Sequence, residues 1–380
     1  MLLVETVFWT SVALVAYTLF GYPLLALLLS VVARRPTQRE AITPAVSFII
    51  AAYNEEAVIG EKLEQTLALD YPRDRLEIIV ASDGSTDRTD QIVLGFADRG
   101  VRLFRSNDRL GKTHTLNGAV AAASGEIVVF SDATGVFSPR AIRDLVAHFA
   151  DPSVGCVTGR VAYQYGRDVT SSGFRVYQRF AVAVRMAESA WGSETSVSGS
   201  IHAMRRALYR PADPAFSLDV INAVHTVAAG QRVLYERAAV SLEESRTRLQ
   251  DEFRVRVRIA VRGMSMVPYI VRTLLRPARP VYLFQMISHK FFRWWLWMFL
   301  LAALVSHACL ATRGGFYGWT FAIHAGVYLT GAMALVAGLR NVRLPGLSGL
   351  SLFLLGNVGM AVGALKAWRG QRMPRWEPVR

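Results

Sequence analysis

Three acidic residues in the middle of the chain, Glu55, Asp83 and Asp132, each come shortly after a short apolar run. Short apolar runs that alternate with amphipathic stretches are typical of strands and helices in a parallel, doubly wound sheet. Because such sheets bind ligands outside the carboxyl ends of their strands, we expect the three acids to share one ligand-binding edge. The pattern therefore predicts an α/β domain that handles a polar, nucleotide-like ligand.

The predicted elements of this domain follow one another between residues 45 and 165. The expected strands are Val46–Ala51, Leu76–Ala81, Val101–Phe104, Glu126–Phe130 and Gly155–Val161. The expected helices are Ala57–Leu67, Asp87–Ala97, Thr113–Ala122 and Pro139–Phe149, the last of which has proline at its first position.

Long apolar runs lie on both sides of the α/β region. Residues 6–32 are long enough to cross a hydrocarbon core of ~30 Å, and Arg34 and Arg35 follow them closely. The run is too long for the core of a signal peptide and lacks a basic start, so we expect a retained anchor. Because lysine and arginine are enriched on the cytoplasmic side of spans, we predict an integral protein of the plasma or inner membrane with a cytoplasmic α/β domain.

Three further apolar runs, at residues 294–311, 319–339 and 347–365, predict C-terminal spans. They leave the topology open, because three spans would place the basic residues that follow them on the outside, against the usual charge bias. The last run contains four glycines, so a re-entrant or interfacial position is the alternative.

Residues 251–263 alternate apolar and basic side chains, which fits a strand. However, Arg254, Arg258 and Arg262 recur every four residues and therefore also share one helical face. Since membrane segments follow soon after, we prefer an amphipathic helix at the bilayer surface.

The chain is both hydrophobic and basic: 52% of its residues are hydrophobic, and its formal net charge is +14. Many arginines flank apolar runs, which favours contacts with anionic lipid headgroups, so we expect membrane lipids and no nucleic acid among the partners. Two cysteines, Cys156 and Cys309, are too few and too far apart for a disulfide framework or a zinc site.

Each charged residue near a strand end has a chemical and a purely structural interpretation. The Asp83 carboxylate is able to accept hydrogen bonds from a base or a ribose, with a turn that caps a helix as the alternative. Asp132 offers oxygen ligands to a hard divalent cation, and Lys112 at a helix start offers an ammonium to phosphate. Another turn and an exposed lysine are the corresponding alternatives. The sequence has no Gly-x-Gly-x-x-Gly turn, which argues against a dinucleotide enzyme.

Together and in this order, the motifs resemble those of family 2 glycosyltransferases over roughly residues 45–262. Residues 46–56 are similar to the family's first strand and nucleotide loop, and residues 111–117 resemble the segment that brings a lysine to the diphosphate. Asp83 matches the nucleoside-binding carboxylate, and Asp132 matches the first acid of the metal-binding Asp-x-Asp element. The resemblance implies one Rossmann-like sheet of the type A glycosyltransferase fold, with transmembrane helices at both ends.

The resemblance also implies roles for individual residues. The expected nucleotide-sugar-binding residues are Tyr53, Glu55, Asp83, Lys112 and Asp132, of which Asp132 is also the expected metal ligand. Asp219 is the expected catalytic base, because an acid followed eleven residues later by glycine is similar to the family's acidic motif; a helix N-cap is the alternative. The expected acceptor-site residues are Glu188, Ser198, Gly199 and Arg258.

Membrane-bound members of this family are related to cellulose, hyaluronan and poly-N-acetylglucosamine synthases. The resemblance implies inverting transfer of a hexosyl or N-acetylhexosaminyl group from a nucleotide diphosphate sugar, expected to be a UDP-sugar, to a glycan or lipid-linked acceptor. It further implies Mg²⁺ or Mn²⁺ as cofactor, a β-linked product, a place in cell-envelope or exopolysaccharide synthesis, and other polysaccharide-assembly proteins as partners. The expected organisation is an anchor at 1–35, a glycosyltransferase domain at 45–250, an amphipathic interface segment at 251–290, transmembrane segments at 291–367 and a basic tail at 368–380.

Some positions depart from the family's pattern. Thr134 replaces the second acid of the metal-binding element, Leu218 stands where an acid is common, and Ala51 stands where a proline is usual. Of the processive members' Gln-x-x-Arg-Trp signature only Arg258 remains, so continuous polymerisation is not implied. Thr134 and Leu218 keep open the alternative of a catalytically degenerate homologue that serves as a membrane assembly partner. A membrane transporter subunit is a separate alternative.

Overall fold

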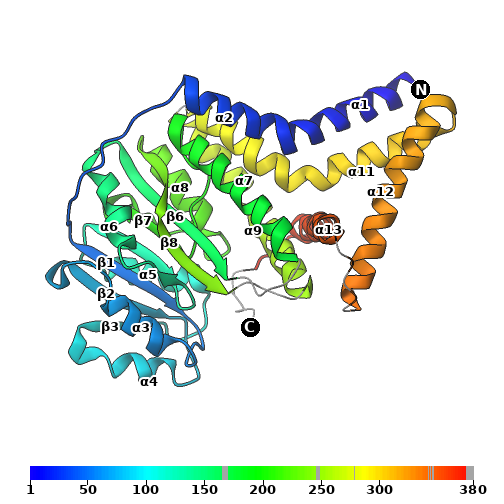
Figure 1. Cartoon of the computed structure of the whole chain (residues 1–380). Helices are drawn as coiled ribbons and strands as arrows, with labels where there is room; N and C mark the ends of the chain where they lie inside the picture. Colours follow the sequence, from blue (N-terminus) through cyan, green and yellow to red (C-terminus); the bar gives the residue numbers. More distant parts are fainter. Residues whose placement is uncertain are drawn as a thin grey trace.

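The computed structural model describes residues 1–164, 170–244, 249–277, 279–340, 342, 344 and 346–373, and their side chains except those of 164, 170–177 and 244. An α/β domain lies on one side of the molecule, and a group of long helices extends from it on the other (Figure 1). The part of the expected basic tail beyond residue 373 lies outside the described residues.

The sheet of the α/β domain has the strand order β3-β2-β1-β4-β7-β6-β8-β5. Its first half is parallel and consists of β1 (Val46–Ala52), β2 (Leu76–Ser82), β3 (Val101–Arg105) and β4 (Ile127–Asp132). These strands lie close to the apolar runs that predict them. All seven residues of β1 are buried, as expected for a central parallel strand with helices on both faces.

The second half of the sheet is mixed. β7 (Ile201–Arg205) is antiparallel to β4 and to β6 (Val154–Gln164), whereas β8 (Arg232–Glu244) is parallel to β6 and antiparallel to β5 (Val136–Phe137). The prediction of a parallel sheet is therefore wrong for β7 and β5, which were not predicted as strands, whereas β6 and β8 run in the same direction as β4. The reason is that β7 follows the long helix α7 (Thr170–Trp191) and enters between β4 and β6 in the opposite direction, without the crossover that makes neighbouring strands parallel.

Helices cover both faces of the sheet. On one face, α3 (Ile59–Leu67), α4 (Thr89–Leu94) and α6 (Ala141–Val146) contribute to one hydrophobic core. On the other face, α5 (Lys112–Ala121) and α8 (Leu218–Ala228) contribute to a second core. Short 3-10 turns occur at Arg73–Arg75, Ala97–Arg99, Ala147–Ala150 and Arg206–Leu208. The second core includes residues of the long helices, so the α/β domain and those helices share one apolar interior.

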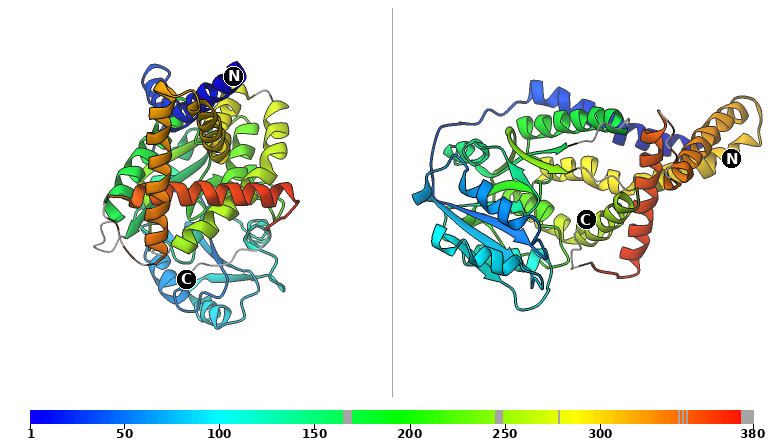
Figure 2. Two further views of the ribbon diagram at one scale, coloured as in Figure 1. Left: turned by 90° about the vertical axis from the view of Figure 1, so that its right-hand side faces the viewer. Right: turned by 60° about the horizontal axis from the view of Figure 1, so that its bottom comes forward.

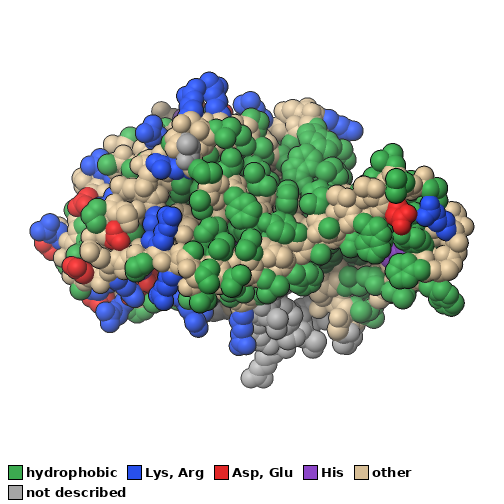
Figure 3. Space-filling model, turned by 90° about the horizontal axis from the view of Figure 1, so that it is seen from above, with side chains coloured by type: hydrophobic (Ala, Val, Ile, Leu, Met, Phe, Trp, Pro, Cys, Tyr) green, Lys and Arg blue, Asp and Glu red, His purple; other side chains and the backbone are tan. Residues whose placement is uncertain are grey.

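Within the described residues, four helical segments are long and apolar enough to cross a membrane. They are α1–η1–α2 (Leu2–Ala16, Tyr17–Gly21, Tyr22–Val32), α10–η6–α11 (Pro280–Gln285, Met286–Phe291, Phe292–Ala311), α12 (Gly315–Leu339) and α13 (Ser348–Trp368). Large apolar residues on them face outward, such as Leu28 with a relative exposure of 58% and Ile323 with one of 68%. Seen from above, hydrophobic side chains spread over much of the surface (Figure 3).

Residues 251–263 belong to helix α9 (Leu249–Leu275), so the helical interpretation of their arginine spacing is confirmed. α9 packs along α13 and against α8. It therefore connects the α/β domain to the C-terminal apolar helices.

Candidate active site

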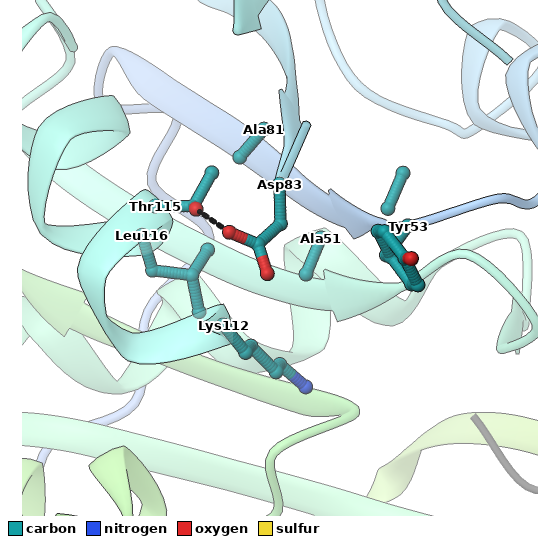
Figure 4. A pocket seen from close by; sticks show the side chains of 8 residues that line it. Ala51, Tyr53, Ala81, Asp83, Lys112, Thr115 and Leu116 are labelled. Carbon is teal, nitrogen blue, oxygen red and sulfur yellow. Dashed lines mark hydrogen bonds between the residues drawn. The ribbon is translucent and has the colours of Figure 1, made fainter. Parts of the chain in front are cut away.

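The carboxyl ends of β1, β2 and β4 lie next to one another because these neighbouring strands are parallel and in register. Ala51 of β1 pairs with Ala81 of β2 and with Asp132 of β4. A small pocket at this edge is lined by Tyr53, Asp83, Lys112, Ala51, Ala52, Ala81, Thr115 and Leu116 (Figure 4). Three of the residues predicted to bind a nucleotide sugar therefore line one pocket.

Asp83 is buried and holds the start of α5 in place. Its carboxylate accepts hydrogen bonds from the backbone N–H groups of Leu110 and Gly111, each at 3.0 Å, and from the Thr115 hydroxyl at 2.8 Å (Figure 4). Hydrogen bonds to a charged acceptor are roughly twice as strong as neutral ones. Asp83 thus fixes the loop that leads into Lys112, which is a structural role, and its role in binding a nucleoside stays a prediction.

The loop at residues 53–55 is fixed against the loop that follows β2. Asn54 adopts a left-handed backbone conformation with φ of 53°, and its side-chain oxygen accepts a hydrogen bond from the Thr86 N–H at 2.8 Å. The Arg109 guanidinium lies over the Tyr53 ring at 4.1 Å from its centroid. Glu55, the last residue of this loop, is buried. The ring of Tyr53 consequently forms one wall of the pocket.

Lys112 and Asp132 form an ion pair at the end of β4, and the Ser200 hydroxyl donates a hydrogen bond to the second Asp132 oxygen at 3.1 Å. Ser200 reaches this position because β7 is antiparallel to β4, so the start of one strand meets the end of the other. A Cβ added at Gly199 would lie 3.8 Å from the Lys112 ammonium. The structure therefore brings two predicted donor-site residues together with the predicted acceptor-site residue Gly199.

Oxygen ligands for a divalent cation are sparse at this edge. Among the described residues, no group of three or more His, Cys, Asp or Glu side chains comes together as a metal site. Asp132 offers one carboxylate, and the exposed Thr134 offers a hydroxyl two residues later. Mg²⁺ prefers oxygen ligands and usually retains several waters. These residues fit a cation that takes most of its ligands from a bound diphosphate and from water.

Lys62 lies beneath the turn that follows Asp132, and the sequence did not predict it. Its buried ammonium donates hydrogen bonds to the Ser131 hydroxyl at 2.7 Å and to the carbonyl of Gly135. Burial lowers its pKa to about 7, and the negative charge of Asp132 opposes this effect. The sequence signal that could have indicated Lys62 is its position three residues after Ile59, on the buried face of α3, where a charged side chain is uncommon.

Asp219 lies in the first turn of α8 and is half-buried. Its carboxylate accepts hydrogen bonds from the Ser217 hydroxyl and from the Val220 N–H, and its carbonyl accepts one from the Val197 N–H at 2.8 Å. The last bond attaches Asp219 to the segment that continues to Ser198 and Gly199. The N-cap of α8 is Ser217, so the helix-capping interpretation of Asp219 is wrong, and the residue lies beside the predicted acceptor loop.

His202 of β7 lies among the three charged residues of this region. Its ring stacks on Phe130 with centroids 4.5 Å apart. Burial lowers its pKa to about 4, and the charges of Asp219, Lys112 and Asp132 all act on it. The charge of Asp219 and the charges of the Lys112–Asp132 pair therefore both reach the His202 ring.

Glu188 is fully buried in α7, away from the strand ends. Its carboxylate accepts hydrogen bonds from the Tyr22 hydroxyl of α2 and from Thr195 at 3.4 Å, and the His289 ring of η6 lies 2.8 Å from it. Burial raises its pKa to about 7. Glu188 therefore joins the apolar helices to the segment at residues 192–199, and in this structure it does not face open solvent.

The two remaining predicted acceptor-site residues lie on different elements. The Ser198 N–H donates a hydrogen bond to the Thr158 hydroxyl of β6 at 2.8 Å. Arg258 is half-buried in α9. Their acceptor roles stay predictions.

Residues 47–210 match the family described as "Glycosyl transferase family 2". The chain contains a family 2 glycosyl transferase domain. The match begins in β1 and ends after β7, and it includes Tyr53, Glu55, Asp83, Lys112 and Asp132. Asp219 and Arg258 follow the end of the matched region.

Curated relatives of the family 2 domain carry glycosyltransferase names. A β-monoglucosyldiacylglycerol synthase of Synechocystis sp. is 37% identical over 123 residues, 31% of this chain and 26% of that protein. The probable glycosyltransferase YdaM of Bacillus subtilis is 26% identical over 268 residues, 67% of this chain and 64% of its own. A poly-β-1,6-N-acetyl-D-glucosamine synthase of Staphylococcus epidermidis is 34% identical over 116 residues, 30% of this chain and 28% of that protein. The chain thus spans between about a quarter and two thirds of these relatives' length.

Among solved structures, the mannosyltransferase PcManGT from Pyrobaculum calidifontis, determined with GDP-Man and Mn²⁺, is similar with a TM-score of 0.72 and 24% identity. The similarity covers 97% of this chain and 99% of that one. It confirms the predicted type A glycosyltransferase fold, with the family 2 domain and the apolar helices in one architecture.

Proposed function

We propose that this protein is a membrane-bound, inverting glycosyltransferase that moves a sugar from a nucleotide diphosphate sugar to an acceptor hydroxyl. The proposal depends above all on the gathering of Asp83, Lys112 and Asp132 at one edge of a family 2 domain. Sugar transfer from such a donor needs a polar nucleoside site, positive charge at the diphosphate and a base near the acceptor. Each requirement has a candidate residue at or next to this edge.

The nucleoside binds in the pocket between the Tyr53 loop and Asp83. The Tyr53 ring offers a flat surface on which a base stacks once Arg109 has moved aside. Asp83 acts mainly by keeping Leu110 and Gly111 in place, since its oxygens are already used there. We expect a UDP-sugar as donor.

The diphosphate binds at the start of α5. The first turn of a helix presents free N–H groups and the positive end of the helix dipole, which favour phosphate. Lys112 stands at this position and exchanges the Asp132 carboxylate for a phosphate oxygen when the donor binds. Asp132, with Thr134, would hold Mg²⁺ or Mn²⁺, which supplies positive charge to the departing diphosphate.

Asp219 is the proposed general base. The acceptor hydroxyl attacks the anomeric carbon, its proton passes to the Asp219 carboxylate, and the bond to the diphosphate oxygen breaks. One displacement inverts the anomeric centre, so an α-linked donor yields a β-linked product. Positioned general-base catalysis contributes about 10²–10⁴-fold in rate. Support comes from the backbone hydrogen bond between the Val197 N–H and the Asp219 carbonyl, which attaches Asp219 to the segment that continues to Ser198 and Gly199.

The proposed acceptor is a glycan or a lipid-linked glycan. The proposed contacts for this acceptor are Ser198, Gly199 and Arg258. Glu188 accepts a hydrogen bond from Thr195 and so helps to hold the segment that leads to Ser198, whose N–H bonds to Thr158. The candidate spans support a membrane location, with the family 2 domain on the cytoplasmic side of the plasma or inner membrane. Relatives whose names specify β-linked products support the same linkage here and a role in cell-envelope or exopolysaccharide synthesis.

A donor screen with the full chain in lipid nanodiscs tests the proposal. UDP- and GDP-sugars are added with Mn²⁺, and both thermal stabilisation and released nucleoside diphosphate are measured. We expect one donor class to bind and to release its diphosphate, and EDTA to abolish the release. A lack of binding by every nucleotide sugar, or release that EDTA leaves unchanged, would contradict the proposal.

A further inference from the structure

Helix α13 has the length and hydropathy of a membrane span, yet its first residues lie on the side of the α/β domain. It follows α12, whose last turn is next to the start of α9. A Cβ added at Gly338 of α12 would lie 2.9 Å from the side chain of Leu249, the first residue of α9. α9 itself packs against α8 of the α/β domain. The chain therefore enters α13 from the side on which that domain lies.

The residues that follow α13 lie on the same side. The Arg262 Nε of α9 donates a hydrogen bond to the carbonyl of Met373 at 2.9 Å. Arg372 lies 3.7 Å from the carboxylate of Asp213 in the α/β domain. A helix that crossed the bilayer would carry these residues through a hydrocarbon core of ~30 Å. Both ends of α13 are instead close to the α/β domain.

The opposite side of the membrane is marked by other residues. Glu5 at the start of α1 accepts a hydrogen bond from the Tyr317 hydroxyl at 2.7 Å and pairs with Arg313 at 3.3 Å. Past the far end of α2, the Arg35 N–H donates to the carbonyl of Ala190 in α7 at 2.8 Å. The segments α1–α2, α11 and α12 therefore each connect this second side with the α/β domain.

α13 lies against a helix that is too polar for the hydrocarbon core. A Cβ at Gly359 would be 2.8 Å from the Cβ of Arg256, and one at Gly363 would be 2.5 Å from the carbonyl of Val257. α9 carries four arginines between positions 254 and 262. Each arginine at the bilayer centre costs about 2.5–3.5 kcal/mol on insertion scales, so α9 belongs at the surface. The close contact puts α13 at the same depth.

The outward face of α13 is apolar and ends in an aromatic cluster. Val358 and Leu365 are about half exposed, and Trp368 lies with its ring 5.7 Å from that of Trp295 and 6.2 Å from that of Trp297. Tryptophan is enriched at the level of lipid headgroups. In the left view of Figure 2, α13 runs across the direction of α12.

We propose that α13 lies in the plane of the membrane surface beside α9, with Val358 and Leu365 inserted between lipid headgroups and acyl chains. Three helical segments then cross the bilayer, and residues 369–373 stay on the side of the α/β domain. This arrangement removes the conflict with the charge bias, because Lys366, Arg369 and Arg372 come to lie on the same side as Arg34 and Arg35. It does not depend on sugar transfer.

Cysteine labelling tests the side on which the chain lies after α13. In a background with Cys156→Ser and Cys309→Ser, single cysteines are introduced by Gln371→Cys, Asp74→Cys and Thr312→Cys, all at exposed positions. Sealed vesicles of both orientations are treated with a membrane-impermeant maleimide. We expect Gln371→Cys to label in the same orientation as Asp74→Cys in the α/β domain, and Thr312→Cys in the opposite one. Labelling of Gln371→Cys together with Thr312→Cys would overturn the proposal.

A depth measurement tests the orientation of α13 independently. Spin labels at Val358→Cys and Leu365→Cys are compared by their accessibility to oxygen and to a water-soluble nickel complex. Seven helical residues span about 10 Å, so a crossing helix would give clearly different depths, whereas a helix in the surface plane gives nearly equal depths. The matched pair Leu329→Cys and Val336→Cys on α12 is expected to differ in depth. Unequal depths on α13 comparable to those on α12 would refute its in-plane position.

Discussion

The ammonium of Lys112 and the carboxylate of Asp132 form an ion pair at the end of β4, where a diphosphate and a divalent cation are proposed to bind. The Asp132 carboxylate thus lies where a phosphate is proposed to bind Lys112, and the Lys112 ammonium lies where a cation is proposed to bind Asp132. Because the second acid of the metal-binding element is replaced by Thr134, Asp132 is the sole carboxylate that the element offers. The pair therefore predicts weak metal binding in the absence of donor.

Thr134→Asp is expected to strengthen metal binding, because it adds a second carboxylate ligand two residues after Asp132. The Mn²⁺ concentration for half-maximal diphosphate release should fall about tenfold, which corresponds to about 1.4 kcal/mol of binding free energy. Thr134→Asn adds a side chain of similar size without charge and serves as the matched control. Equal metal dependence of Thr134→Asp and wild type would argue against a cation at this turn.

Lys62→Met is expected to change how stability depends on pH. Burial lowers the Lys62 pKa from 10.5 to about 7, so the unfolded chain binds more protons than the folded one between these values. The wild type should therefore gain stability as pH rises from 7 towards 10, by up to about 1.4 kcal/mol per pH unit. The variant should lack this gain, as measured by thermal denaturation at pH 7, 8 and 9.

Lys366→Met, at the other end of the molecule, should retain the wild-type slope. If Lys62→Met retains it too, then Lys62 is not the group that titrates. Since Lys62 also donates to Ser131 and Gly135, we expect weaker donor binding in Lys62→Met through a loosened turn around Asp132.

Glu188→Gln is also expected to change how stability depends on pH, but at lower pH than Lys62→Met does. Burial raises the Glu188 pKa from 4.5 to about 7, so the folded state binds more protons than the unfolded state between pH 4.5 and 7. Its contribution to stability is complete below pH 4.5 and is lost as pH rises through 7. Gln does not titrate, so the denaturation midpoint of the variant should fall less between pH 5 and 8. The exposed Glu61→Gln provides the comparison, and an unchanged slope in Glu188→Gln would rule out this origin of the pH effect.

Asp83→Asn is expected to weaken the loop before α5. The amide replaces one carboxylate oxygen by a donor that faces the backbone N–H groups of Leu110 and Gly111. An unmade hydrogen bond to a buried group costs about 1–3 kcal/mol, so both the denaturation midpoint and the donor affinity should fall. Asp74→Asn, at an exposed ion pair, should leave both unchanged. If Asp83→Asn binds the donor with normal affinity, Asp83 does not contribute to the nucleoside site.

The parallel half of the sheet was predictable because each of its strands is a short apolar run followed by turn residues. Asp132 and Asp83 come directly from this pattern, since neighbouring parallel strands end at one edge. The mixed half was not predictable in this way. β7 follows β4 only after β5, α6, β6 and α7, and no local sequence signal indicates the direction in which a strand enters a sheet.

The positions of buried polar groups also escaped prediction. Glu188 resembles a family residue near the acceptor, but only the packing of α2 and η6 around α7 explains its contacts with Tyr22 and His289. Lys62 lies under the Asp132 turn because α3 packs against β5, a contact between segments about 70 residues apart. Such contacts depend on tertiary structure, and sequence spacing alone does not contain them.

The most direct test of the account is a comparison of Asp219→Asn with the wild type in nanodiscs, with donor binding and sugar transfer measured on the same preparation. Asn retains the size of the side chain and a hydrogen-bond acceptor for Ser217, but it is unable to accept the proton of the acceptor hydroxyl. We expect unchanged donor affinity and a loss of transfer of about 10²-fold or more. Transfer close to the wild-type rate, with the donor bound equally well, would contradict it.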